Sequence, residues 1–591
     1  MLALMFVLPS TGNQHTAAAN RQQKAGQESK IFEFRNAAPG IAYVGSKVCS
    51  GCHADIYHDY VKTDMGRSMS LPSGQTELEK VPSPITIFDK RSNRYFQVLR
   101  EGSNLYQSEY ELGADGNEVF RDTHKIEYVI GSGANGSSYV IRRGEFLFEA
   151  PLTYYSRNMS WGLSPGYELG NYGFSRPILA GCIVCHSGLA QPFPDGNGRF
   201  RDPPFRELAI GCENCHGPGQ LHVEERMQGR PISGNSDRTV VNPAKLPGWL
   251  ADNICMYCHQ TGDSRVLQPG KDYYDFRPGM PLNDTLAIFA APYKRQSPPA
   301  DPLLQHFASM ILSKCYRHSG GRLSCITCHN PHDQSSRSEA PAYYRNKCLK
   351  CHTANSCTVP LKLRLGRTPP DDCAGCHLLK QNLKLISHAS LTNHRIIVYE
   401  GEPYPESAFR QTTPQLPDLV HLNAIPGEET LPIKPFVLFQ AYGELMRSHP
   451  NYGARCRELL DQVARIEADN ILVLSALARK KLMEGTAQAN LEATRYLSRS
   501  IERGSKLVPD YMLLADLLSR SGQIPEAIDI LKRAMELAPY SSQLYNVLSL
   551  AYISAHKYSE GLEIIRKGLE LFPGDRSLRL LRQKVELPGS P

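Results

Sequence analysis

Seven copies of one short pattern, Cys-x-x-Cys-His, occur in this chain of 591 residues. Its 17 cysteines and 19 histidines would produce about 0.02 such copies by chance. The copies, numbered here as motifs 1 to 7, are Cys49, Cys52 and His53; Cys182, Cys185 and His186; Cys212, Cys215 and His216; Cys255, Cys258 and His259; Cys325, Cys328 and His329; Cys348, Cys351 and His352; and Cys373, Cys376 and His377. The fold must therefore accommodate seven local sites of one kind.

Each motif has the chemistry of a covalent haem c anchor. Two thiols separated by two residues can form thioether bonds with the two vinyl groups of one haem, and the adjacent imidazole can bind its iron as the proximal ligand. Zinc is the main alternative, but zinc ribbons need a second cysteine pair or a spaced histidine pair. Redox dithiols give no reason for the histidine. We therefore expect seven haems, with the fourteen motif cysteines as attachment sites and the seven motif histidines as iron ligands.

The crowding of the motifs constrains the fold. Six of the seven lie between Cys182 and His377, so that each has about 33 residues of chain. So little chain cannot build a conventional side-chain core. We expect the porphyrins themselves to form the interior, wrapped by short helices and loops, and to lie close enough together to form a chain of redox centres.

The second axial ligand of each iron must come from outside the motifs, and its identity tunes the potential of the haem. Eight other histidines lie between residues 50 and 400, which favours mostly bis-histidine, low-potential haems. The expected ligands are His124, His222, His306, His332, His388 and His394. His222 and His332 lie close to their own motif histidines along the chain, so we expect each to bind a neighbouring haem. Met65 is a competing ligand through its thioether, and His58 and His318 are the less favoured histidines.

The residues resemble a known family, the multihaem c-type cytochromes with doubled CxxCH motifs, which are related to the tetrahaem cytochrome partner of hydroxylamine oxidoreductase and are often followed by tetratricopeptide repeats. The resemblance covers about residues 44–396. It is carried by the segments "CSGCHADIYHDYVKTDMGRSMS", "YVIGSGANGSSYV", "SPGYE", "CENCHGPGQLHV", "SCITCHNPHD" and "CAGCHLL…SHASLTNHRI".

The resemblance implies that His222 and His332 are distal ligands, because they match the histidines after "GPG" and in the "CH.PH" segment. The chain departs from the family in two places. It has Leu378 and Leu379 where the last motif resembles a "CHMP" form, and it has Met65 where relatives often have a histidine.

The rest of the chain suggests three further parts. Residues 80–160 lack a motif and read as a small β-rich insert, with strands in "RYFQVLREGSNLYQSEYEL" and "GEFLFEAPLTYY". Seven prolines in residues 401–435 predict an extended linker. In residues 436–591 a 34-residue period predicts tetratricopeptide repeats, whose helix pairs would meet at small residues. The residues in register are Pro539 and Pro573, Ala527 and Gly561, Ala534 and Gly568, Leu537 and Leu571, with weaker echoes at Ala493 and Ser500.

The predicted fold is therefore mainly α: a haem-cored multihaem cytochrome c domain over residues 44–400, with a β-rich insert, followed by an all-α repeat solenoid. Residues 1–43 are expected to hold a signal peptide, with an apolar run from Met1 to Leu8 and alanines at 17–19, whose basic start was lost to a wrongly assigned start codon. The alternative is a disordered polar N-terminus. Export would place the protein in the periplasm or outside the cell.

Charge and the remaining cysteines add smaller constraints. The formal net charge of +7 is spread along the chain, which does not imply a nucleic-acid partner but would suit acidic proteins or anionic substrates. No apolar run is long enough for a transmembrane segment. Cys456 is expected to be buried, and Cys315 and Cys357 to pair as a disulfide in an oxidising compartment.

Three functions fit these features. The first is an electron carrier outside the cytoplasm that passes electrons between redox protein partners, with the repeats binding a protein or peptide. The second is a reductase or oxidoreductase that acts on a small inorganic nitrogen or sulfur compound at one open haem. In the third, the repeats are the functional part and the cytochrome reports redox state. A capping helical domain without a client is the alternative for the repeats themselves.

Overall fold

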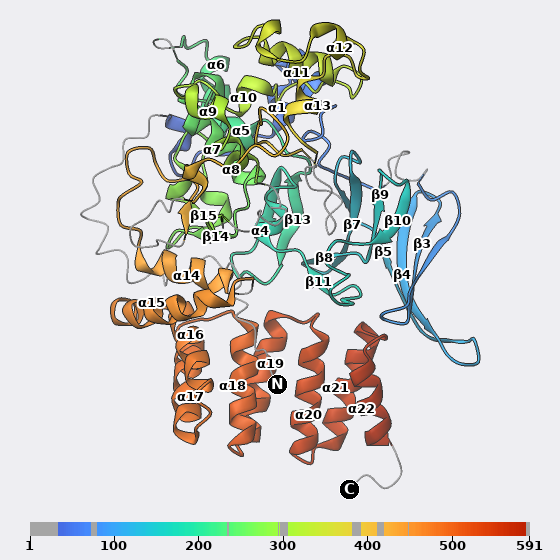
Figure 1. Ribbon diagram of the computed structural model, residues 1–591. Coiled ribbons are helices and arrows are strands. Elements are labelled where there is room, and N and C mark those ends of the chain that lie inside the picture. The colour runs from blue at the N-terminus through green and yellow to red at the C-terminus, as the bar shows by residue number, and fades with distance from the viewer. Residues whose placement is uncertain are drawn as a thin grey trace.

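The computed structural model describes residues 34–72, 80–232, 234, 236–293, 295, 305–380, 392–409, 419–446 and 448–586. Figure 1 shows three regions: short helices and loops that carry most of the motifs, antiparallel sheets beside them, and a row of paired helices below both. The apolar run and the alanines of the expected signal peptide lie outside the described residues. Within the described residues, no helix is long and apolar enough to cross a membrane.

The β region contains two antiparallel sheets and confirms the predicted hairpin. One sheet has the order β2-β3-β4-β5, and the other runs β1-β6-β7-β8-β11, with β9 joining β7 to β10. The strands are β1 (Met69–Ser70), β2 (Ile85–Asp89), β3 (Arg94–Glu101), β4 (Asn104–Leu112), β5 (Glu118–Lys125), β6 (Tyr128–Ile130), β7 (Gly136–Arg143), β8 (Phe146–Glu149), β9 (Leu152–Tyr155), β10 (Ser160–Leu163) and β11 (Arg176–Pro177).

Alternation of apolar residues places one face of each strand in the core. In β3, Phe96 and Val98 are each 1% exposed and pack with Leu105 of β4. Gly102 has a φ of 59° in the turn between β3 and β4, where a residue with a side chain would be strained. The segment expected to form one strand in 144–155 forms two, β8 and β9, because the chain turns at Ala150 and Pro151.

Two smaller sheets lie among the motifs. They pair β12 with β13 and order β14-β15-β16. Their strands are β12 (Leu189–Pro192), β13 (Phe200–Glu207), β14 (Ser264–Leu267), β15 (Leu286–Ala290) and β16 (Val420–His421).

The region around the motifs is built from short helices, as the spacing of the motifs predicts. The longest has twelve residues. The α-helices are α1 (Ser46–Cys49), α2 (Ala54–Tyr60), α4 (Ala180–Ile183), α5 (Glu213–His216), α6 (Gln220–Met227), α7 (Gly248–His259), α8 (His306–Met310), α9 (Lys314–His318), α10 (Cys325–Cys328), α11 (Ala340–Cys348), α12 (Leu361–Leu365) and α13 (Cys373–His377). The 3₁₀ turns are η2 (Arg35–Ala37), η3 (Pro243–Lys245), η4 (Tyr273–Asp275), η5 (Leu282–Asp284) and η6 (Ala354–Ser356).

The carboxyl-terminal region confirms the predicted helical repeat. Its helices are α14 (Pro435–Leu445), α15 (Gly453–Ile466), α16 (Ile471–Leu482), α17 (Ala487–Glu502), α18 (Val508–Arg520), α19 (Ile524–Leu537), α20 (Ser542–Ser554), α21 (Tyr558–Leu571) and α22 (Arg576–Glu586), with the 3₁₀ turn η8 (Pro450–Tyr452). The starts of α19 and α21 are 34 residues apart. The small residues in register are buried between helices. A Cβ added to Gly568 would lie 2.7 Å from Leu578 Cδ1 and 3.0 Å from Tyr545 Cβ.

The predicted linker is packed against the rest of the chain where it is described. The turn η7 (Glu406–Phe409) is followed by β16, which pairs with β15 through Phe289 and His421. Phe436 and Phe439 of α14 then share one core with Val266 of β14. The first repeat helix is therefore continuous with the small β14-β15-β16 sheet.

The far end of the repeats contacts the large sheets. Tyr540, between α19 and α20, meets Phe146 and Phe148 of β8 edge to face, with ring centroids 5.4 and 5.7 Å apart. Arg579 of α22 donates a hydrogen bond to Glu111 of β4 at 2.7 Å. The row of helices thus touches the rest of the chain at both ends (Figure 1).

Candidate functional site

Each motif occupies about one turn of helix. In four motifs the backbone N–H of the histidine donates to the carbonyl oxygen of the first cysteine at 3.0 Å. These motifs begin at Cys49, Cys212, Cys325 and Cys348. Residues three and four positions apart share one face of a helix. The Cys-x-x-Cys-His spacing therefore brings both sulfurs and the imidazole to the same side of the backbone, where one planar ligand can meet all three.

Thiols from different motifs are neighbours. Three pairs are within hydrogen-bonding reach: Cys49 and Cys212, Cys185 and Cys258, and Cys255 and Cys325. Burial, together with a nearby thiol of another motif, raises the pKa of Cys215 (beside Cys255), Cys328 (beside Cys351) and Cys348 (beside Cys373). Neighbouring thiols therefore link motif 1 to motif 3, motif 3 to motif 4, and so on in order to motif 7. Motif 2 is linked to motif 4.

Two motif histidines face a histidine from another part of the chain in nearly parallel pairs. The ring of His53 lies 6.4 Å from that of His222, with 19° between the ring planes. The ring of His216 lies 5.8 Å from that of His332, with 16° between the planes. In both pairs the second histidine follows a different motif from the one it faces.

Four other histidines form a cluster. The rings of His259 and His306 have centroids 5.6 Å apart, and those of His329 and His394 are 6.1 Å apart. The rings of His306 and His394 are themselves only 4.2 Å apart. The second histidines of motifs 4 and 5 are therefore in direct contact.

The centroid separations of these four pairs match those of two imidazoles that bind one metal ion. An imidazole nitrogen lies about 2 Å from a metal that it binds. Two imidazoles on opposite sides of one metal ion therefore have ring centroids about 6 Å apart. Each pair has the centroid separation expected of two imidazoles with one ion between them.

Hydrogen bonds to Nδ1 orient several of these rings. His216 Nδ1 donates to Val241 O at 2.7 Å, and His377 Nδ1 donates to Ile397 O at 2.7 Å. His394 Nδ1 makes the same kind of bond to Thr392 O at 3.1 Å. A donor at Nδ1 fixes the tautomer and leaves the lone pair on Nε2, which is the arrangement found in metal-binding histidines.

Desolvation shifts several of these rings toward the neutral form. Burial, together with the neighbouring histidines, lowers the pKa of His306 to about 3 and that of His329 to about 4. Burial also lowers the pKa of His216, His259 and His394. A neutral imidazole has the lone pair that a metal ion needs, so these rings are ready to bind without losing a proton.

Two acidic residues that support the site were not among the residues expected from the sequence. Asp237 lies 3.0 Å from His222 Nδ1 and orients that ring. Glu213, inside motif 3 and 2% exposed, accepts hydrogen bonds from the N–H groups of Val44, Gly45 and Gly219. It therefore joins the loop before motif 1 to the loop that leads to His222. Only the position of Glu213 within a motif could have drawn attention to it.

The structure does not bring His124 to a motif. It lies in β5, where its Nε2 is 2.8 Å from Asp122 Oδ1 and 2.8 Å from Arg143 Nη2. Both contacts occupy the nitrogen that would bind iron, because the β insert turns this strand toward the repeats. This placement does not fit the expected role of His124 as a ligand.

The remaining candidates differ in their surroundings. His222 already faces His53, and Met65 is half-buried in the turn after α2. His58 is exposed and contacts Lys62 and Asp59, and His318 is exposed at the end of α9. His388 lies outside the described residues.

The three cysteines outside the motifs are all free thiols. Cys315 lies near the motif cysteines Cys328 and Cys351, and the disulfide expected between Cys315 and Cys357 is not formed. Cys456 is 4% exposed under α14, as predicted. Among the described residues, no group of three or more His, Cys, Asp or Glu side chains forms a candidate site for a bare metal ion.

No protein-family model matches this chain, and no curated protein matches it. The solved structures that match segments of this chain include TPR-domain proteins. The TPR domain of Arabidopsis OM64 is 15% identical, and the match covers 20% of this chain and 93% of that one, with a TM-score of 0.18. The first TPR of Spaghetti (RPAP3), bound to an HSP90 peptide, is 18% identical over 20% of this chain and 89% of its own, also with a TM-score of 0.18.

A crystal structure of MamA is 19% identical over 24% of this chain and 86% of its own, with a TM-score of 0.21. Scores this low do not define the fold of the whole chain. The helical repeat rests instead on the paired helices α16 to α21 and on their buried small residues.

Proposed function

We propose that this protein is a multihaem c-type cytochrome that transfers electrons outside the cytoplasm, with its helical repeats binding a protein partner. One observation carries the proposal. Four motif histidines face a second imidazole at centroid separations of 5.6 to 6.4 Å. The motif spacing and these pairs fit haem, because an iron porphyrin takes four ligands from its own ring and two axial ligands from the protein.

When bound, haem supplies an iron that accepts and releases one electron. The residues of this chain contribute the rest. The motif cysteines would hold each group covalently. Hydrogen bonds at Nδ1 orient the rings of His216, His222 and His394. Desolvation favours the neutral form of His306 and His329. Two imidazoles on one iron leave no open position, which favours electron transfer over catalysis at those four sites.

The spatial order of the motifs supports a continuous path. Adjacent thiols connect motifs 1, 3, 4, 5, 6 and 7 in turn. The contact between His306 and His394 is a second link between motifs 4 and 5. Electrons would enter and leave at the ends of this path. Export to the periplasm or the cell exterior, where haem c is expected to be retained, belongs to the same proposal.

A catalytic alternative is favoured by one observation. His352 is exposed, and no imidazole of a described residue faces it or His377. A haem at motif 6 or 7 with an open sixth position would bind a small nitrogen or sulfur compound. A high-spin ferric signal that shifts on addition of nitrite or hydroxylamine would favour this reductase function.

The axial pairs can be tested by electron paramagnetic resonance of the oxidised holoprotein. We expect His332→Ala to convert the haem of motif 3 from low-spin to high-spin while its covalent attachment is retained. The matched control is His318→Ala, an exposed histidine of the same region, which should leave the spectrum unchanged. A spectrum of His332→Ala identical to that of the wild type would contradict the proposed pair.

A further inference from the structure

Positive charge is concentrated around the last two motifs. Residues 340–380 contain seven lysines and arginines but only two aspartates. One of these, Asp371, is 4% exposed and is held between Arg345 and Arg364 at 2.5 Å each. Five basic side chains, namely Lys347, Lys350, Lys362, Arg367 and Lys380, are left with Asp372 as the only other acidic residue of this segment.

Exposed apolar side chains lie among these basic residues. Leu361, Leu363 and Leu365 of α12 are 44%, 62% and 56% exposed, and they alternate with Lys362 and Arg364. Four basic residues, Lys350, Lys362, Arg367 and Lys380, are also exposed. Together these leucines and basic residues form what we call the cationic end surface.

This surface is attached directly to two haem anchors. Arg367 Nη1 lies 3.2 Å from the sulfur of Cys376 in motif 7. Helix α11 ends at Cys348 of motif 6, and Arg345 of the same helix ties it through Asp371 to the start of α13. The cationic end surface therefore lies beside motifs 6 and 7, and the Asp371 ion pairs join α11 and α12 beneath it.

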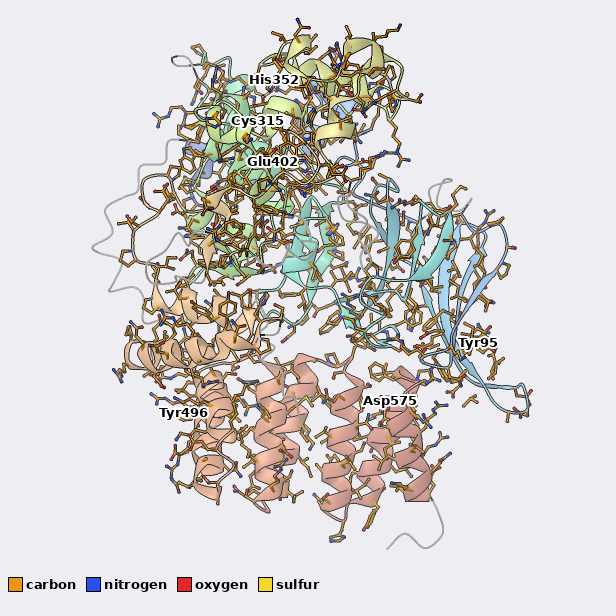
Figure 2. All side chains as sticks on the ribbon, viewed as in Figure 1. Tyr95, Cys315, His352, Glu402, Tyr496 and Asp575 are labelled. Carbon is orange, nitrogen blue, oxygen red and sulfur yellow. The ribbon has the colours of Figure 1, made fainter. Side chains whose placement is uncertain are left out.

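The surface lies at an end of the molecule. Figure 1 shows α11, α12 and α13 at the edge farthest from the repeats. Figure 2 shows His352 near that edge, with Tyr496 and Asp575 in the repeat region below. Motif 7 also ends the spatial series of motifs, so this is where the path between thiols reaches the surface.

The arrangement fits a protein better than a membrane. At about 100° per residue, Leu363 lies on the opposite side of α12 from Leu361 and Leu365. A single turn with leucines on both sides has no apolar face to lay in a bilayer. Exposed apolar residues surrounded by charge are typical of short-lived protein interfaces, in which charge speeds the encounter.

We propose that the cationic end surface docks a small acidic electron-transfer protein, which exchanges electrons with the protein at motifs 6 and 7. This proposal rests on the proposed function. In the direction tested here, one electron leaves the reduced iron–sulfur centre of an acidic ferredoxin, which is oxidised, and is taken up by the oxidised holoprotein, which is reduced.

The test is stopped-flow reduction of the full-length holoprotein by a reduced acidic ferredoxin, at several salt concentrations. We expect Lys350→Glu combined with Lys362→Glu to lower the second-order rate constant at low salt by about tenfold or more and to flatten its salt dependence. Leu363→Asp should slow the reaction at all salt concentrations. The matched controls are Lys90→Glu with Lys125→Glu, two exposed lysines of the β region, and Leu169→Asp, which is 80% exposed.

Three results would overturn the docking proposal. The charge-reversal variant could react like its control, or a basic monohaem cytochrome could react as fast as the ferredoxin. The variant could also lose binding to vesicles of phosphatidylcholine and phosphatidylglycerol while keeping its rate with ferredoxin, which would assign the surface to lipid. Haem absorbance of each variant separates these outcomes from failure of the proposed function, because a protein without haem contradicts both.

Discussion

The repeat region and the motif region are held together in different ways. In the repeats, the core is made of side chains: Leu531, Ala534 and Leu544 are each at most 1% exposed. In the motif region the helices are only four to twelve residues long, and most motif cysteines and histidines are half-buried or exposed. The repeats can therefore fold around their own side chains. The motif region has a smaller side-chain core around Ile254 and Ile288, and the proposed function requires the bulk of haems to complete it.

The largest effect is expected from removing the haem altogether. The protein produced without haem attachment should lose ordered structure across the motif region, because short helices do not persist without tertiary packing. Residues 436–586 should stay helical. Limited proteolysis followed by mass spectrometry would measure this, and equal resistance of both regions to the protease would show that the contrast is wrong.

A cavity in the repeats should destabilise the repeats and leave the motif region unchanged. Leu531→Ala removes a fully buried side chain of α19 and should lower the free energy of unfolding of the repeats by about 2–5 kcal/mol. The haem absorption spectrum should not change. The control is Leu580→Ala, whose side chain is 50% exposed and whose effect should stay within about 0.5 kcal/mol. Urea unfolding followed by circular dichroism reports both variants.

The segment that joins the motif region to the repeats includes β16, and its contribution to the free energy of unfolding should depend on pH. Burial lowers the pKa of His421 in β16 to about 4, below its ordinary value of 6.5. The unfolded chain therefore binds this proton first as the pH falls, so stability is fully present above pH 6.5 and is lost progressively toward pH 4. His421→Gln should reduce the difference in unfolding free energy between pH 7 and pH 5. An unchanged difference would show that His421 does not contribute to the pH dependence of stability.

The smallest effect is expected at the far contact between repeats and sheets. Arg579→Ala removes the hydrogen bond to Glu111 and the contact with the Phe120 ring, at a cost of about 1 kcal/mol. The loss is small because Arg94 still pairs with Glu111. Thermal unfolding compared with Arg582→Ala, a more exposed arginine of the same helix, would measure it. A loss as large as that of Leu531→Ala would mean that the repeats depend on the sheets for stability.

Local patterns in the sequence predicted much of this structure. The crowding of the motifs predicted short helices, and two strand-like runs around a glycine turn predicted the hairpin of β3 and β4. The 34-residue period predicted that the small residues Ala527 and Gly568 lie between helices. These features depend on residues close together in the chain, so elementary geometry fixes them.

Contacts between distant segments could not be predicted in the same way. Nothing near His124 in the sequence indicates that Arg143 lies against it, and nothing near Asp237 indicates that it orients His222. The shared core of Val266 and Phe436 likewise joins segments 170 residues apart. Such placements are set by the packing of whole regions against each other.

The most direct test of the central claim is the intact mass of the purified full-length protein, measured together with its haem absorbance. The account predicts a mass that exceeds that of the polypeptide by seven haem groups, with none of the fourteen motif cysteines available to a thiol reagent. A colourless protein of unmodified mass, in which all fourteen of those cysteines react, would contradict it.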